Sequence, residues 1–198
     1  MVIKLKKKDN NTKSKIVSAA WKLFYENGFE NTTIDEIVEL SHTSKGSFYH
    51  YFKSKEAILG SLAYLFDEKY VQLEETIDYS KSTIDIMLEL NKELFSIIEN
   101  SIDVELLSHL YSQQLSQYAD KEFLDHTREY YKLLKKIVQL GQERDEITKE
   151  KSASEVVRIY ALAERALIYD WCLHNGNYSL KEYSANILPL FLLGIKND

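Results

Sequence analysis

Apolar residues recur along most of this chain every three or four positions, a spacing that places them on one face of an α-helix. Alternating apolar and polar residues, the pattern of half-buried strands, are not sustained anywhere. The 198 residues include one proline and six glycines, so long helices are seldom interrupted. We therefore expect an all-α fold of about nine helices, over residues 12–27, 34–40, 44–52, 55–79, 82–101, 103–118, 120–145, 152–174 and 180–196.

Several predicted helices begin at a capping box, in which a Ser or Thr accepts a backbone hydrogen bond and a Glu three positions later reaches back. Gly28 supplies the left-handed backbone that ends the first helix, and Asn175-Gly176 stops the eighth. These signals set helix boundaries independently of the apolar pattern. The capping boxes are Thr33 with Glu36, Ser152 with Glu155, and Ser179 with Glu182.

The two short helices over 34–40 and 44–52 are joined by a turn at residues 41–43, so together they form a helix-turn-helix. Phe48 and Phe52, four residues apart, pack inward. The outward positions carry hydrogen-bond donors and no carboxylate, which suits the DNA major groove because phosphates repel acids. Gly46 lets the backbone approach a phosphate closely. The outward donors are Ser44, Lys45, Ser47, Tyr49 and His50.

Residues 33–59 resemble the DNA-binding segment of the TetR family of bacterial transcriptional repressors. The family usually has Ala-Gly-Val in the turn, whereas this chain has Ser41-His42-Thr43. We expect His42 to adopt the left-handed backbone that glycine normally supplies there, since His is one of the residues enriched in it. The resemblance rests on Thr33, Ile37, Ser44, Gly46, Phe48, Tyr49, Phe52, Lys55, Glu56 and Leu59.

The resemblance implies two domains: a helix-turn-helix DNA-binding domain at 1–54, and a helical domain for ligand binding and dimerisation at 55–198. It implies a homodimeric regulator that represses transcription from a palindromic operator and is released by a small-molecule effector. Phosphate contacts are expected from Lys45, Tyr49, Lys55 and the Thr33 cap. Base-edge contacts are expected from Ser47 and His50, and Thr43 could make either kind of contact.

The residues expected to line a ligand pocket in the larger domain are aromatic. Tyrosine suits a ligand pocket because its ring is apolar and its hydroxyl orients a ligand. Excess acid favours a cationic ligand, with Glu68, Glu89, Glu105 or Glu164 as its partner. The candidate pocket residues are Phe66, Tyr70, Phe95, Tyr111, Tyr130, Tyr131 and Tyr169.

The last two predicted helices are apolar on more than one face, which indicates either a central position or cover by another subunit. By the resemblance, the pair forms a dimerisation hairpin and two copies make a four-helix bundle; the alternative is a purely intramolecular core. The candidate dimer residues are Tyr160, Leu167, Trp171, Leu188, Phe191 and Leu192.

The net charge of −6 is unevenly distributed. Residues 1–60 hold ten lysines and seven acids, and the remainder of the chain carries a net −9. A basic head on an acidic body fits a DNA-facing module. Lys4, Lys6, Lys7 and Lys8 could form an arm that touches phosphate, or be a solvated tail.

Motifs for other classes of protein are not found. Cys172 is alone, which is consistent with a reducing cytoplasm. The apolar run at 187–195 is far shorter than the ~20 residues that span a bilayer. No nucleophile–base pair, phosphate loop or zinc ligand set is seen. We expect a cytoplasmic protein without metal, cofactor, membrane span or enzymatic activity; a helical adaptor and a small-molecule-binding protein or enzyme in the helical body remain alternatives.

Overall fold

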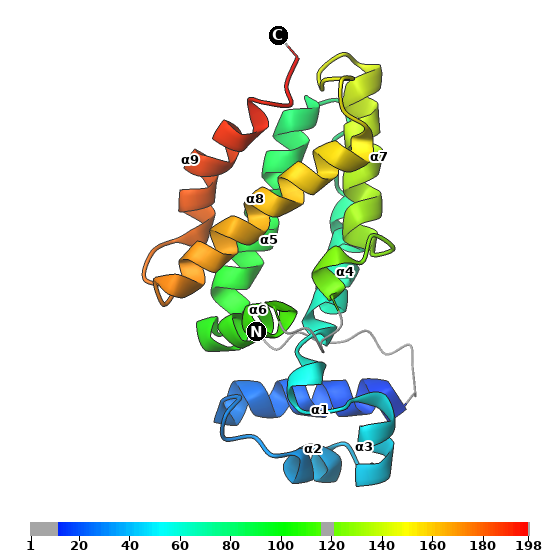
Figure 1. Cartoon of the computed structure of the whole chain (residues 1–198), viewed down its shortest axis with the longest axis vertical. Helices are drawn as coiled ribbons and strands as arrows, with labels where there is room; N and C mark the ends of the chain where they lie inside the picture. Colours follow the sequence, from blue (N-terminus) through cyan, green and yellow to red (C-terminus); the bar gives the residue numbers. More distant parts are fainter. Residues whose placement is uncertain (1–11, 116–120, 198) are drawn as a thin grey trace. The chain divides into compact units, whose positions relative to one another are not determined.

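The structure, a computed structural model, describes residues 12–115 and 121–197, without the side chains of residues 64 and 65. Within those ranges the fold is all-α, as predicted, with nine α-helices and an isolated bridge between Ile147 and Lys196 as its only β pairing (Figure 1). The predicted lysine arm at residues 4–8 lies outside the described residues. The helices are α1 (Thr12–Asn27), α2 (Ile34–Leu40), α3 (Lys45–Tyr51), α4 (Ser61–Glu74), α5 (Thr83–Ser101), α6 (Val104–Leu115), α7 (Glu129–Glu143), α8 (Ala153–Leu173) and α9 (Leu180–Leu192), with 3₁₀ turns at Glu56–Ile58 and Glu122–Leu124.

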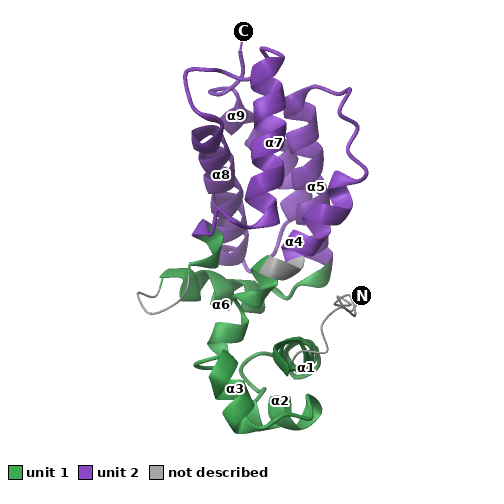
Figure 2. Cartoon of the chain, turned by 90° about the vertical axis from the view of Figure 1, so that its right-hand side faces the viewer, with its two compact units in different colours: residues 1–65, 101–123 green, residues 66–100, 124–198 purple. Residues whose placement is uncertain are grey.

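The chain divides into two compact units, coloured separately in Figure 2. Unit 1 comprises residues 1–65 and 101–123, and unit 2 comprises residues 66–100 and 124–198. This division differs from the predicted domains of 1–54 and 55–198, because residues 55–65 and α6 pack with the helix-turn-helix segment. The boundary between the units falls inside α4.

The helix caps form as the sequence predicts. Thr33 and Ser152 each make both halves of a capping box. At Ser179 only half of the box forms: the hydroxyl accepts from the backbone of Glu182 and itself donates to Glu99. Local sequence signals therefore fix these helix starts, since the bond from the backbone of each glutamate to its capping hydroxyl spans only three residues.

Two long helices predicted from the apolar pattern are shorter in the structure. The helix predicted over 55–79 is split into the 3₁₀ turn Glu56–Ile58 and α4, which begins only at residue 61. At Gly60, between them, the chain runs so close to Glu122 that a β-carbon would overlap its carboxylate. The helix predicted over 120–145 begins at Glu129. Asp125 accepts from both the backbone and the hydroxyl of Thr127, a local turn that competes with helix formation.

In unit 2, α8 packs against both α7 and α9 (Figure 1). A buried ion pair joins α4 to the start of α7: Asp67 accepts from Arg128 Nε at 3.0 Å and Nη2 at 3.2 Å, and from the backbone of Tyr130 at 3.1 Å. An exposed pair, Lys136–Glu74 at 2.7 Å, links the same two helices. None of the described helices is both long enough and apolar enough to cross a membrane.

The buried and exposed pairs differ in the energy that they should contribute. Asp67→Ala leaves the Arg128 charge buried without its carboxylate and should lower the free energy of unfolding by roughly 3–5 kcal/mol. Glu74→Ala, the matched control on the same helices, should cost about 1 kcal/mol or less. Urea denaturation followed by circular dichroism measures both changes. Equal losses for the two variants would contradict the assignment of Asp67 as the main tie between α4 and α7.

Candidate nucleic-acid interface

The turn between α2 and α3 has the backbone predicted for it. His42 has a φ of 53°, in the left-handed region. Ser41 and Thr43 share a hydroxyl hydrogen bond of 2.8 Å across the turn, and the backbone N–H of Thr43 donates to Val38 at 3.1 Å. The turn therefore accommodates His without the usual glycine, and its geometry is fixed by bonds on both sides of that residue.

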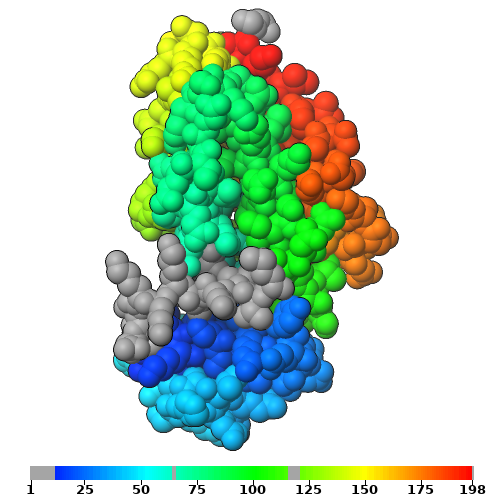
Figure 3. Space-filling view, turned by 180° about the vertical axis from the view of Figure 1, so that it is seen from behind, coloured from blue at the N-terminus to red at the C-terminus, as the bar shows by residue number. Residues whose placement is uncertain are grey.

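α3 is oriented by the side chains that it buries. Phe48 is fully buried and Phe52 nearly so, and α1 packs against both α2 and α3. The hydroxyl of Ser44 accepts from the backbone N–H of Ser47 at 3.0 Å and so caps the helix. With the phenylalanines inward, Tyr49 and His50 are exposed, as predicted. In Figure 3 the light-blue atoms of the helix-turn-helix lie open on the face shown.

Lys45 is exposed at the first position of α3, but its ammonium is not free. It forms an ion pair of 2.7 Å with Asp35 of α2, and this hydrogen bond raises the pKa of Lys45 above its ordinary value. The residue pattern of α3 alone does not indicate this contact, because Asp35 lies on α2. An acid in the first turn of α2 was visible in the sequence, but its reach to α3 depends on the turn geometry.

Lys55 has a different role from the one predicted. Its ammonium donates to the backbone carbonyls of Phe29 at 2.6 Å, Thr32 at 2.9 Å and Glu30 at 3.3 Å, and lies over the Phe29 ring. We correct the predicted phosphate contact on this ground, since a cation bound to three carbonyls holds the loop between α1 and α2 in place. Thr33, whose hydroxyl is engaged in its capping box, follows that loop directly.

α6 holds the same loop from another side. His109 Nε2 lies 3.1 Å from Glu30 Oε1, and its ring packs on that of Phe29 with centroids 4.8 Å apart. Lys55 and α6 thus fix the segment from which α2 begins, and through it the position of the helix-turn-helix. Neither contact has a signature in the local sequence pattern.

A polar network occupies the interior of unit 2. Glu164 on α8 is buried and accepts from Asn91 on α5 at 2.8 Å and from Tyr130 on α7 at 2.7 Å. Ser184 of α9 donates to Asn91 and extends the network to a fourth helix. Burial raises the pKa of Glu164, and these hydrogen bonds oppose the rise. Tyr160, whose hydroxyl donates to the carbonyl of Met87, packs beside it.

The predicted pocket aromatics do not form one cluster. Tyr130 packs against Tyr70 and Tyr131, with ring centroids 5.1 Å and 4.8 Å apart, inside unit 2. Phe95 is also buried there and Phe66 is half-buried. Tyr111 belongs to unit 1, where it contacts Phe123, and Tyr169 is half exposed on the surface of α8.

The predicted dimer residues require a larger correction. Tyr160, Leu167, Trp171, Leu188 and Leu192 are buried within the protomer and cannot present a surface to a partner, whereas Phe191 is 46% exposed. The apolar pattern missed this because α8 and α9 are apolar on more than one face. The large apolar side chains that α8 and α9 do expose are Leu162, Tyr169, Leu173, Tyr183, Leu190 and Phe191, with Leu193 following α9.

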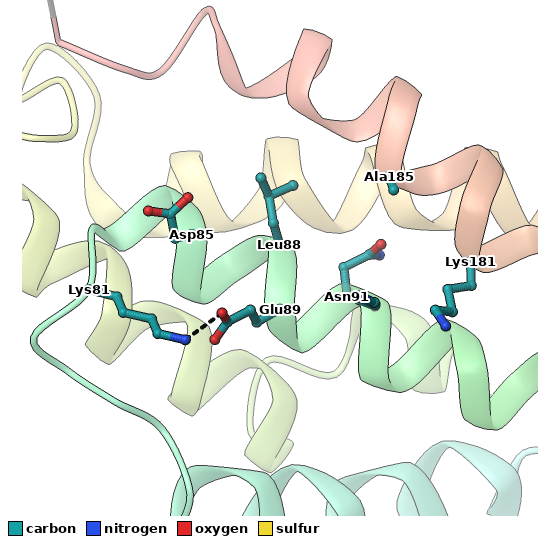
Figure 4. Close-up of a pocket in the computed structure, with 8 residues that line it drawn as sticks. Lys81, Asp85, Leu88, Glu89, Asn91, Lys181 and Ala185 are labelled. Atoms are coloured by element: carbon teal, nitrogen blue, oxygen red, sulfur yellow. Dashed lines mark hydrogen bonds and ion pairs between the residues drawn. The ribbon is translucent and has the colours of Figure 1, made fainter.

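A cavity of ≈ 400 Å³ lies between α5 and α9 in unit 2 (Figure 4). Lys81 and Glu89 form an ion pair of 2.6 Å at its edge, and Leu88 and Ala185 give it an apolar surface. Asn91, which also lines it, connects the cavity to Glu164. None of the aromatic residues predicted to bind ligand is among its lining residues.

The helix-turn-helix and its exposed donor face define a DNA-binding transcriptional regulator. Residues 16–62 match the family model described as bacterial regulatory proteins, tetR family. The DNA-binding segment of the chain is therefore that of the TetR family of transcriptional regulators.

Relatives and a solved structure agree with this assignment. The chain is 26% identical over 188 residues to the "Fatty acid metabolism regulator protein" of Bacillus subtilis (strain 168), covering 92% of this chain and 94% of that protein. It is 32% identical over 107 residues to the "HTH-type transcriptional regulator QacR" of Staphylococcus aureus, covering 51% and 56%. The fold matches that of Thermus thermophilus FadR, a TetR-family repressor solved with lauroyl-CoA, with a TM-score of 0.75, 22% identity and coverage of 91% and 93%.

Proposed function

We propose that this chain is a homodimeric repressor that binds a palindromic operator and is released by a small-molecule effector. The observation that carries the proposal is the exposed face of α3. This face presents hydrogen-bond donors, while Phe48 and Phe52 are buried on the opposite side and hold the helix in place. Lys45 and Tyr49 contact phosphates, while Ser47 and His50 read base edges. Ser44, Gly46, Thr43 and the Thr33 cap line the rest of this interface, and a regulator of this kind works in the cytoplasm.

Release of the operator requires a change in the spacing of the two helix-turn-helix segments of the dimer. In the dimer they meet major-groove faces ~34–36 Å apart, or a multiple of that distance. An effector that favours another spacing weakens operator binding by its coupling free energy, typically ~1–3 kcal/mol, while a near-complete switch needs ~5.5 kcal/mol. Effector binding in both protomers adds these contributions.

Operator selection from random duplex DNA, followed by gel shift, tests the DNA-binding proposal. We expect a palindromic site to be enriched. Lys45→Ala should weaken binding to every sequence and reduce the salt slope, because a phosphate contact is lost, whereas His50→Ala should relax sequence preference. Lys55→Ala is the matched lysine control: it should destabilise unit 1 without changing the salt slope. Enrichment of no sequence would favour an adaptor that has kept only the fold.

The dimer surface proposed here is the exposed apolar set of α8 and α9. Leu162, Tyr169 and Phe191 are each between 46% and 61% exposed, and apolar side chains grouped on two neighbouring helices mark an interaction site. Two copies of this surface would bury them in an isologous interface.

Phe191→Lys should weaken this dimer at least about tenfold, because a two-fold interface would bury the new charge twice. Sedimentation equilibrium over a dilution series measures the dissociation constant. Glu150→Lys, an exposed change in the connection before α8, is the control and should leave the constant unchanged. A wild-type chain that stays monomeric at micromolar concentration would contradict the proposal.

For the effector, we propose a fatty acyl thioester of coenzyme A. Support comes from the relative that spans nearly the whole chain, which is named for fatty acid metabolism, and from the fold shared with a repressor bound to lauroyl-CoA. A cationic amphiphile is the second candidate, since buried Glu164 next to Tyr130 offers a carboxylate and an aromatic ring to a cation.

Two ligands with the same twelve-carbon chain separate these classes. Lauroyl-CoA should release the operator in a fluorescence-polarisation assay, while coenzyme A alone and submicellar dodecyltrimethylammonium should not. Glu164→Gln keeps the side-chain shape and should leave the lauroyl-CoA response intact. Release by the ammonium compound that disappears in Glu164→Gln would instead establish the cationic class.

A further inference from the structure

The charge of the helix-turn-helix is negative where it is expected to meet DNA. Between residues 23 and 52, Lys45 is the only lysine or arginine. α2 carries three acids, Asp35, Glu36 and Glu39. Glu36 is committed to its capping box with Thr33, but Asp35 has no such task and its carboxylate binds Lys45. The one fixed positive charge of these two helices is thus cancelled in the free protein.

The pair is placed where a phosphate would displace it. The side chains of Lys45 and Asp35 are 61% and 70% exposed, and exposed pairs contribute little to stability. Lys45 begins α3 and lies in the proposed phosphate contact. A carboxylate that stayed on the ammonium there would be held close to the phosphate and repelled by it.

We infer that Asp35 competes with DNA phosphate for Lys45, and so lowers the affinity of the helix-turn-helix for all DNA. The inference rests on the proposed DNA-binding function and adds a residue that opposes it. Binding must break one ion pair and leave a carboxylate that takes up a cation from solution. The counterion released from DNA by Lys45 is therefore partly offset by the cation that Asp35 attracts, because a lone surface carboxylate binds less than one full cation.

Fluorescence polarisation with the selected operator and a scrambled duplex, over a range of KCl concentrations, tests the inference. Asp35→Asn should tighten binding about two- to fivefold on both duplexes, the range expected for an exposed pair. It should also steepen the plot of log K against log salt by up to about one unit, since the cation taken up at Asp35 in the wild type no longer offsets the counterion release. Equal gains on both duplexes are expected because phosphate contacts carry no sequence information.

A double-mutant cycle separates the ion pair from general charge repulsion. The gain from Asp35→Asn should be larger with Lys45 present than in Lys45→Ala, because only the first includes the pair. Glu39→Gln removes an exposed acid from the same helix and should give the same small gain in both backgrounds. Circular dichroism checks that each variant is folded.

Two results, each with wild type that binds DNA, would overturn this inference but not the proposed function. The first is an equal gain in affinity from Asp35→Asn with and without Lys45. The second is a loss of affinity in Asp35→Asn when Lys45 is present. The second would show that Asp35 orients Lys45 toward the phosphate. Wild type that binds neither duplex at any salt concentration would overturn the proposed function and this inference with it.

Discussion

The presentation of the donor face depends on the burial that holds two very short helices in place. α2 and α3 have seven residues each, well below the ~12–15 residues at which isolated helices become stable in water. Their order comes from Ile37 and Phe48, both fully buried, and from α1, which packs against both. Lys55 adds the tie to the preceding loop. The position of the proposed DNA-contacting side chains is therefore set by hydrophobic side chains that lie inside the protein.

Three charged side chains of the helix-turn-helix and its flanks are used within the protein. Lys55 binds backbone carbonyls, Glu36 completes a cap, and Lys45 is paired with Asp35. Each of these bonds stabilises local geometry or cancels a charge. In the proposed function, the head therefore depends less on an excess of positive charge than its composition indicates, and more on neutral donors such as His50 and Ser47. Neutral donors read base edges with a weaker salt dependence than cations that bind phosphates.

Features set by neighbouring residues could be predicted from the sequence. The caps at Thr33 and Ser152 and the left-handed backbone at His42 involve bonds within a few positions, so their residue types reveal them. The all-α class follows from apolar spacing that is repeated along the whole chain. Asp35 was missed because its contact with Lys45 joins two helices. The break at Gly60, where Glu122 approaches, was missed for the same reason.

The surface of the hairpin shows the limit of the apolar pattern most clearly. Tyr160 and Leu167 were expected to face a partner, yet they lie in the protomer core, while Leu162 and Tyr169 are exposed. On a helix that is apolar all round, periodicity cannot decide which face turns inward. That choice is made by tertiary contacts, such as the bond from the Tyr160 hydroxyl to the carbonyl of Met87.

Buried polar groups in unit 2 connect α4 to α7 and α8. Asp67 lies on α4 two residues beyond the unit boundary, and its partner Arg128 begins α7. Tyr130 donates its backbone N–H to Asp67 and its hydroxyl to Glu164, so it joins the ion pair to the buried network. Buried polar groups of this kind are costly to separate. A shift of α7 relative to α8 must therefore either break these bonds or move α4, and α4 continues without interruption into unit 1.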